Sequence, residues 1–258
     1  MAANINADHI IINDINTSVL GLFEWMYGKD PNKIISDLKK VVRHFGLSDT
    51  SKNGYAFYGC DSSAGLASHN KAAFIELRSE YNKTKEPLML YALIVFAFNN
   101  QVRFNASGAY NLPVGKRDFN QSMQDKLVSF ITSINAKSEV IFTKKDFRLL
   151  NTEALPKDTL IYCDPPYLIT TASYNESGGW TEKDELDLLA FLELLDNKGF
   201  KFALSNVLEA KNQENVILKE WLISKKFTCH NLVKSYANSN YQRKNKGANS
   251  TEVLITNN

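Results

Sequence analysis

The residues with the most distinctive chemistry are Asp164, Pro165, Pro166 and Tyr167, which directly follow the apolar stretch Thr159 to Cys163. The two prolines lack N–H groups, so backbone carbonyl oxygens stay available as acceptors beside a carboxylate. An amine with two hydrogens, such as the exocyclic amine of adenine, could donate one to Asp164 and the other to the Pro165 carbonyl. Tyr167 offers a flat face on which an unstacked base could lie. The alternative is that the four residues form only a rigid turn.

Other polar residues are expected at the same edge of a sheet. The apolar stretches His9 to Ile12 and Phe200 to Leu204 are predicted to be strands, and they run into Asp14 and into Ser205-Asn206. In an open α/β sheet, ligands bind outside the carboxyl ends of the strands. We therefore expect Asp14, Asp164 and Ser205-Asn206 to line one site.

A second kind of chemistry is indicated by two stretches without acidic residues, 99–117 and 221–251. The whole chain has 30 basic and 28 acidic residues, so positive charge is concentrated in these stretches. Cations neutralise phosphates, and amide or guanidinium groups match base edges. Solvated basic faces would explain both stretches equally well. In the first stretch the candidate DNA contacts are Asn99, Asn100, Gln101, Arg103, Asn105, Lys116 and Arg117.

The hydrophobic pattern changes along the chain. Residues 18–98 contain successive predicted helices, of which Lys33 to Phe45 is the clearest, with Gly46 as its stop. The stretches Val102 to Asn105 and Ala109 to Leu112 flank a short turn and are predicted to form a β-hairpin. From residue 121 onward, helices alternate with short strands, which implies a parallel-type sheet with helices on its faces. These strands are predicted at 140–142, 159–163, 200–204, 228–233 and 252–256. Among the helices, one is predicted to open at Thr181 with Asp184 three residues later and to end at Gly199, and another to cover Asn212 to Ser224.

Six blocks spread over nearly the whole chain resemble those of Dam-type (D12 class) DNA adenine-N6 methyltransferases. They are IIINDIN, FAFNNQVRFNASGAYNLPVGKR, KDF, TLIYCDPPYLIT, FALSN and TEVLITN. Other amino-methylating enzymes share DPPY, whereas the long second block is far more specific to this family. The resemblance implies an α/β fold with a Rossmann-like methyltransferase sheet and an inserted, mostly helical target-recognition domain that carries a β-hairpin. The implied catalytic domain comprises residues 1–17 and 124–258, and the recognition domain residues 18–123.

The resemblance also implies an activity. Family members transfer a methyl group from S-adenosyl-L-methionine to the N6 amine of adenine in double-stranded DNA, mostly at GATC, after flipping the base out. The positions that match their catalytic motif are Asp164, Pro165, Pro166 and Tyr167. The positions that match their cofactor-binding residues are Asp14, Asp146, Phe147 and Asp164. Asp14 would bind the ribose hydroxyls, and Asp146 and Phe147 would flank the adenine of the cofactor.

The recognition hairpin of the family matches Arg103, Asn105, Pro113 and Arg117, at positions where family members contact bases and phosphates. Arginine paired with guanine and asparagine paired with adenine are the expected base contacts. Either arginine could equally clamp a phosphate and read no sequence.

The family's amino-terminal strand and glycine-rich turn, which contact the cofactor, have no counterpart in this sequence. The chain starts where that turn would end, so we expect an incomplete cofactor site. An upstream start, a separate chain that supplies the segment, and a defective remnant are three open explanations. The alternative to an active enzyme is therefore a catalytically silent DNA-binding remnant. A methyltransferase for RNA or a protein amide is a third hypothesis, which the long second block disfavours.

Several other classes of function are disfavoured by the composition. The longest apolar run, Leu88 to Phe98, is too short to span a bilayer. Cys60, Cys163 and Cys229 form no CxxC pair, so neither a disulfide framework nor a zinc site is indicated. Methyl transfer from an activated sulfonium needs no metal. We expect a cytoplasmic monomer that binds double-stranded DNA but neither membrane nor metal, and the family suggests a cognate restriction endonuclease as a further partner.

Overall fold

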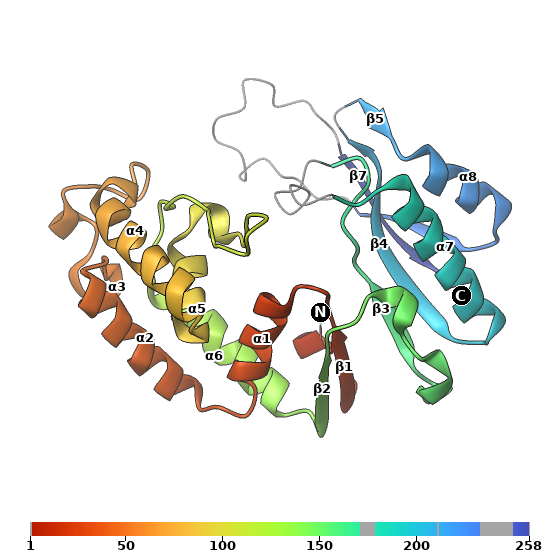
Figure 1. Cartoon of the computed structure of the whole chain (residues 1–258), viewed down its shortest axis with the longest axis horizontal. Helices are drawn as coiled ribbons and strands as arrows, with labels where there is room; N and C mark the ends of the chain where they lie inside the picture. The colour runs from red at the N-terminus through yellow and green to blue at the C-terminus, as the bar shows by residue number, and fades with distance from the viewer. Residues whose placement is uncertain (1, 171–178, 211, 233–249, 258) are drawn as a thin grey trace. The chain divides into compact units, whose positions relative to one another are not determined.

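The computed structural model describes residues 2–170, 179–210, 212–232 and 250–257 (Figure 1). The chain forms two compact units, an amino-terminal unit up to Asp146 and a carboxy-terminal unit from Phe147 onward. Each unit combines helices with a β-sheet that contains parallel strands. The predicted α/β class is therefore confirmed.

Helices make up most of the amino-terminal unit. They are α1 (Thr17–Met26), α2 (Pro31–Phe45), α3 (Thr50–Asn53), α4 (Ala67–Thr84), α5 (Pro87–Phe96) and α6 (Gln121–Asn135). The bounds of α2 follow from its sequence. The Asp30 side chain accepts from the backbone N–H of Asn32, Pro31 occupies the first turn, and Gly46 ends the helix with a φ of 73°. The prediction of a helix that stops at Gly46 is thus confirmed.

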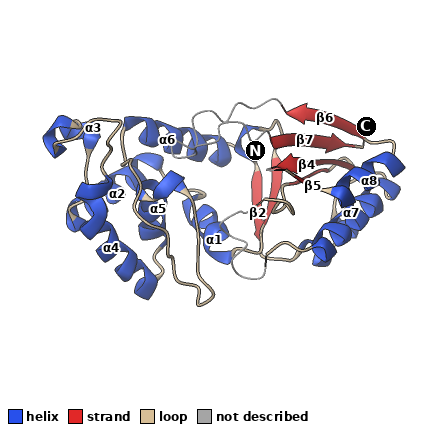
Figure 2. Ribbon diagram, turned by 90° about the horizontal axis from the view of Figure 1, so that it is seen from above, coloured by secondary structure: helices blue, strands red, loops and turns tan. Residues whose placement is uncertain are grey.

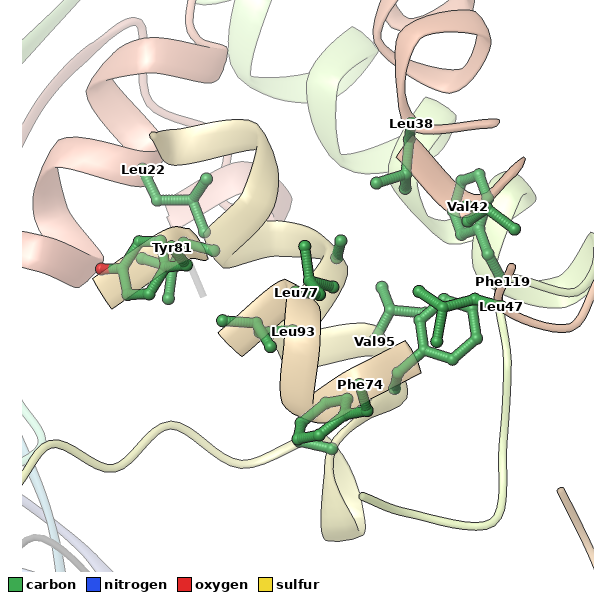
Figure 3. Close-up of a cluster of buried hydrophobic side chains, with 14 of the residues drawn as sticks. Leu22, Leu38, Val42, Leu47, Phe74, Leu77, Tyr81, Leu93, Val95 and Phe119 are labelled. Carbon is green, nitrogen blue, oxygen red and sulfur yellow. The ribbon is translucent and has the colours of Figure 1, made fainter. Parts of the chain in front are cut away.

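The core of this unit forms around α5. Its sequence is apolar on all sides, and Ala92, Leu93, Val95 and Phe96 are completely buried. Helices α1, α2 and α4 pack against it. Figure 3 shows side chains of these helices, among them Leu22, Leu38 and Leu77, gathered around Leu93 and Val95. Burial of apolar surface at roughly 25 cal/mol per Å² holds the bundle together.

A two-stranded parallel sheet completes the amino-terminal unit. Strand β1 (His9–Asn13) pairs with β2 (Glu139–Thr143), and Asn13 lies opposite Thr143. Ile10 and Val140 face a small core with Ile134 of α6. Because the strands are parallel, the residues that follow both of them lie at the same edge of the sheet.

The carboxy-terminal unit has a mixed sheet. Its strands are β3 (Leu160–Cys163), β4 (Lys201–Ala210), β5 (Gln213–Glu214), β6 (Thr228–Leu232) and β7 (Ser250–Thr256). The order is β3-β4-β7-β6, with β3 and β4 parallel and the β4–β7 and β7–β6 pairs antiparallel. Helices α7 (Glu182–Asn197) and α8 (Val216–Ser224) lie beside the sheet (Figure 2). Their apolar residues form a core with the inward residues of β4 and β7.

Three details differ from the predictions. The stretch predicted as a hairpin contains one isolated antiparallel bridge, Phe104–Tyr110, instead of continuous strands, and a second bridge, Ala97–Val114, lies just outside it. Strand β4 is longer than predicted because its second half pairs with β7. Helix α8 starts at Val216 because the Asn215 side chain accepts from the N–H of Leu218 and caps it.

One carboxyl group is completely buried in the amino-terminal unit. Asp118 accepts from the N–H of Thr50 at 2.6 Å, from the Thr50 hydroxyl at 2.8 Å and from the Ser48 hydroxyl at 3.4 Å. Asn70 completes the cluster by hydrogen bonds with Ser48. Burial raises the pKa of Asp118 above its ordinary value of 3.8, although these hydrogen bonds act in the opposite direction.

This raised pKa predicts a pH dependence of stability. The folded protein binds the Asp118 proton more tightly than the unfolded chain does. The stability that results from this difference is fully present below pH 3.8, the ordinary pKa, and is lost as the pH rises through the pKa of the folded protein. The unfolding free energy of the wild type should therefore fall relative to Asp118→Asn over this window. Urea titrations of both proteins at several pH values measure the difference. A difference that stays constant with pH would show that the folded pKa is not raised.

Candidate active site

The DPPY residues directly follow β3, with Asp164 exposed and Pro165, Pro166 and Tyr167 partly buried. Cys163 lies opposite Leu204 in the parallel register, which places Asp164 level with Ser205. The Asp164 side chain is exposed, and its Oδ1 accepts from the Tyr167 hydroxyl at 3.1 Å. In the described part of the chain no group donates to the Pro165 carbonyl. A carboxylate and a carbonyl acceptor are thus both available at the end of β3.

Two neighbouring groups titrate far above neutral pH. Burial, together with the Asp164 carboxylate, raises the pKa of Tyr167, so the residue remains a phenol that donates to Asp164. Burial also raises the pKa of the Cys163 thiol to about 12, with a smaller effect of Asp164. A thiol that stays protonated is a poor nucleophile. Cys163 therefore belongs to the core, and Asp164 is the exposed ionisable group at this edge.

The predicted Ser205-Asn206 pair is divided between the two faces of the sheet. The Ser205 hydroxyl bonds the Tyr162 hydroxyl at 2.7 Å. The Asn206 side chain is 1% exposed and points toward α7, where its Nδ2 donates to Glu185 at 3.0 Å. Of the pair, only Ser205 shares a face with Tyr162.

Glu185 is a buried residue that the sequence reasoning missed. Its Oε1 accepts from Asn206 and from Asn215 at 2.8 Å, and its Oε2 accepts from the Trp180 indole at 2.6 Å. Glu185 thereby joins the start of α7, the strand beside Asp164 and the cap of α8. A signal was present in the sequence, since an acidic residue stands at helical spacing with the apolar residues Leu188, Leu189 and Leu192.

Phe147 lies close to Trp180 in the carboxy-terminal unit. The ring centroids of the two residues are 5.9 Å apart, and the Arg148 guanidinium lies 4.5 Å from the centroid of the Phe147 ring. Arg148 pairs with Asp184 and Asp187 on α7. Hydrogen bonds from Thr181, with a smaller contribution of Arg148, lower the pKa of Asp184 to about 2. This pairing holds Phe147 on the first turns of α7.

In the amino-terminal unit, Asp14 and Asp146 follow the paired strands β1 and β2. Asn13 connects the two chain segments, because its Oδ1 accepts from the Thr143 hydroxyl and the Lys145 N–H and its Nδ2 donates to the Lys145 carbonyl. The Asp14 N–H also donates to the Thr143 carbonyl at 3.2 Å. Asp14 and Asp146 therefore end neighbouring strands at one edge, and Asn13 is a further residue that the sequence reasoning missed.

The candidate DNA contacts all lie in the segment from Phe98 to Arg117, and several of them shape it. Asn99 and Asn100 both have a φ of 53°, a left-handed conformation that asparagine tolerates better than most residues. The Asn100 amide donates to the carbonyls of Ile94 and Val95 at the end of α5. Asn105 Oδ1 accepts three hydrogen bonds from Ser107 and Ala109 and so organises the turn.

The remaining candidates are also held within the unit. Arg103 Nε donates to the Asn111 side chain at 2.7 Å. The Pro113 carbonyl accepts from the N–H of Phe98, whereas Gln101 is exposed. Lys116 and Arg117 donate to a neighbouring loop, to Ser63, Ser62 and Tyr55.

The described residues lack two other classes of site. They contain no group of three or more His, Cys, Asp or Glu side chains that could hold a metal ion. None of the described helices has the length and apolar character needed to cross a membrane.

Comparison with known proteins agrees with the sequence motifs. Residues 1–238 match the family of D12 class N6 adenine-specific DNA methyltransferases. The type II methyltransferase M.FokI of Planomicrobium okeanokoites is 39% identical over 260 residues, which cover 98% of this chain and 36% of that protein. The modification methylase StsI of Streptococcus sanguinis is 35% identical with the same coverage of both chains, 98% and 36%. A DNA adenine methylase of Haemophilus influenzae is 26% identical over 68% of this chain and 54% of that protein. The chain thus spans about a third of the length of the first two relatives.

The role of Asn13 leads to a stability prediction. Asn13→Asp keeps the acceptor for Thr143 and Lys145 but places an oxygen against the Lys145 carbonyl, where the amide had donated. We expect a loss of about 0.5–1.5 kcal/mol in the free energy of unfolding, the net worth of a typical hydrogen bond, measured by urea denaturation. Asn4→Asp is a suitable control for the change in charge, because no hydrogen bond of its side chain occurs within the described residues. Equal stability of Asn13→Asp and the control would refute this role.

The Glu185 cluster predicts strong coupling between two substitutions. In Glu185→Gln the new amide group must face either the Trp180 indole or the two asparagine amides, so at least one buried donor loses its acceptor at a cost of about 1–3 kcal/mol. Trp180→Phe removes the indole donor, so Glu185→Gln should cost less in that background. A double-mutant cycle of unfolding free energies measures the coupling.

Trp221 and Glu193 provide a matched control for this cycle. The indole of Trp221 donates to Glu193 at 2.8 Å, but the Glu193 side chain is 36% exposed, so water can replace a lost partner. We expect little coupling between Trp221→Phe and Glu193→Gln. Similar coupling in the two cycles would contradict a special role of the buried Glu185.

Proposed function

This chain belongs to the D12 class of N6 adenine-specific DNA methyltransferases, and from this premise we propose that it methylates the N6 amine of adenine in double-stranded DNA. The observation that carries the proposal is the exposed Asp164 carboxylate at the end of β3, next to the Pro165 carbonyl. The two acceptors suit the two hydrogens of the target amine. Their hydrogen bonds orient the nitrogen lone pair for attack.

The charge that develops in this reaction explains why a carboxylate is suitable. When the amine nitrogen attacks the methyl carbon, the bond from that carbon to the sulfonium sulfur would break, the nitrogen would become positively charged, and one of its protons would then pass to water. The negative charge of Asp164 stabilises the developing positive charge. The Tyr167 hydroxyl donates to the same carboxylate and fixes its orientation, while the half-buried ring of Tyr167 offers a face for the flipped adenine.

Enzymes of this class use S-adenosyl-L-methionine, which supplies a methyl group already activated by a sulfonium. The side chains available in the two units fit this molecule chemically. Asp14 is exposed, and its Oδ2 has no donor among the described residues, so it can accept from ribose hydroxyls. The ring of Phe147 offers an aromatic surface for adenine. We assign Asp14, Asp146, Phe147 and Asp164 to its binding.

We assign recognition of DNA to residues 18–123 and catalysis to residues 1–17 and 124–258. The long segment after α5 supports this division, because it collects amide and basic side chains on one stretch of chain. In our proposal Asn99, Asn100, Gln101, Arg103, Asn105, Pro113, Lys116 and Arg117 form the DNA-reading surface, with GATC as the first sequence to test. We further propose a cytoplasmic monomer that is paired in the cell with a restriction endonuclease.

Methyl transfer to labelled duplexes tests the proposal. The purified chain is mixed with methyl-labelled S-adenosylmethionine and duplexes that carry either GATC or a scrambled site. We expect label in the GATC duplex, and a loss of about 100-fold or more in rate for Asp164→Asn, because a preorganised charge has been removed from the transition state. DNA affinity should be unchanged in this variant. Asp158→Asn, an exposed carboxylate before β3, should keep the wild-type rate.

Each other outcome has a definite meaning. Equal label in both duplexes would remove GATC as the target and leave the chemistry in place. DNA binding without label in any duplex would favour the catalytically silent DNA-binding alternative. Full activity of Asp164→Asn would overturn the proposed role of this carboxylate.

A further inference from the structure

The loop from Asn53 to Gly65 connects α3 to α4 (Figure 1). It is ordered by its own polar groups. Asp61 Oδ1 accepts from the N–H groups of Ser63 and Ala64, which closes a tight turn. The Tyr58 hydroxyl accepts from the Asp49 N–H at 2.8 Å and from the Asn53 amide at 2.9 Å. A compact surface loop of this length, packed by its own side chains, is frequently a functional element.

This loop is bonded directly to two of the candidate DNA-binding cations. Arg117 Nη1 donates to the Tyr55 hydroxyl and to the Ser62 carbonyl, both at 3.3 Å. Lys116 Nζ donates to the Ser63 carbonyl at 3.1 Å. Gly65 makes this close approach possible, since a Cβ atom there would lie 2.6 Å from the Cβ of Lys116.

The contacts orient the two cations without neutralising them. Their partners are neutral carbonyl and hydroxyl oxygens, and neither cation forms an ion pair with a described residue. Asp61 is the one acidic residue between Asn53 and Gly65 in the sequence, and its Oδ1 is engaged by the turn. The positive charges of Lys116 and Arg117 therefore remain available to phosphates.

The same framework keeps an aromatic side chain in solvent. Phe57 is 71% exposed and contacts Tyr58 edge-on, with 5.0 Å between ring centroids. Tyr58 is itself fixed by its hydroxyl and by the His69 ring, whose centroid is 4.6 Å away. A single exposed aromatic carries little meaning. An aromatic residue on a shaped loop beside two unneutralised cations, however, has the composition of a nucleic-acid-binding surface.

We propose that the loop Asn53–Gly65 is a second DNA-contacting element, in which Phe57 and Tyr55 contact the duplex beside Lys116 and Arg117. The inference rests on the proposed function, because it takes DNA as the substrate. Phe57 makes an apolar contact with a base or sugar, and Tyr55 holds the Arg117 guanidinium toward the backbone. The buried Asp118, which follows both cations in the sequence, accepts two hydrogen bonds from Thr50 at the start of α3, the helix that leads into the loop. The same hydrogen bonds therefore fix both the cations and the loop.

Binding of a fluorescein-labelled GATC duplex, followed by anisotropy at several salt concentrations, tests the loop. Phe57→Ala should weaken binding at least about fivefold with an unchanged salt dependence, because an apolar contact releases no counterions. Phe57→Trp should restore the affinity. Arg117→Gln should instead lower the slope of log affinity against log salt by about 1. Ile75→Ala on α4 is the matched control, since Ile75 is 48% exposed and outside the loop, and it should bind like the wild type.

A photo-crosslinker gives a direct readout of contact. Benzoylphenylalanine at position 57 should crosslink to the duplex, and at position 75 it should not. Full affinity of Phe57→Ala without a crosslink at 57, together with a loss for Arg117→Gln, would overturn the role of the loop and leave the DNA-reading surface intact. A wild-type chain that binds no duplex would overturn both proposals. Thermal unfolding of Phe57→Ala should match the wild type, because the side chain is exposed.

Discussion

Buried polar side chains that must find hydrogen-bond partners fix the functional segments of this protein. Apolar packing around α5 and on the inner face of the β4–β7 sheet is non-directional, so it stabilises the units without defining where a carboxylate points. A buried acceptor without a donor costs about 1–3 kcal/mol, which is more than a hydrogen bond usually contributes. The clusters around Glu185 and Asp118 meet this requirement completely, since no buried side-chain polar atom of the described residues lacks a partner.

Each polar cluster supports a different part of the proposed machinery. Glu185 connects Asn206 in the strand next to Asp164 with Trp180, which contacts Phe147. Asn13 connects the ends of β1 and β2, which are followed by Asp14 and Asp146. In both cases a side chain that the proposed mechanism does not use determines where the residues assigned to the reaction can lie.

The sequence allowed correct prediction of features that depend on neighbouring residues. The start of α7 follows from Thr181 and Asp184, whose side chains form a reciprocal capping box. The end of α2 at Gly46 and the position of Asp164 after β3 follow from equally local patterns. The missed features depend on residues far apart in the chain. The partners of Glu185 on β4 and α8, the pairing that extends β4, and the attachment of Arg117 to Ser62 have no counterpart in local spacing.

In the segment from Phe98 to Arg117, a structural duty and the proposed DNA-binding duty can coexist in one side chain. Asn105 uses Oδ1 for its turn, while the described residues leave its Nδ2 without an acceptor. Arg117 uses Nη1 to bond the loop, and no described residue accepts a hydrogen bond from its Nε or Nη2. The atoms that hold each side chain thus differ from those that can meet a base or a phosphate. Because such side chains are already ordered in the free protein, binding loses less conformational entropy, which favours affinity for the DNA that we propose as substrate.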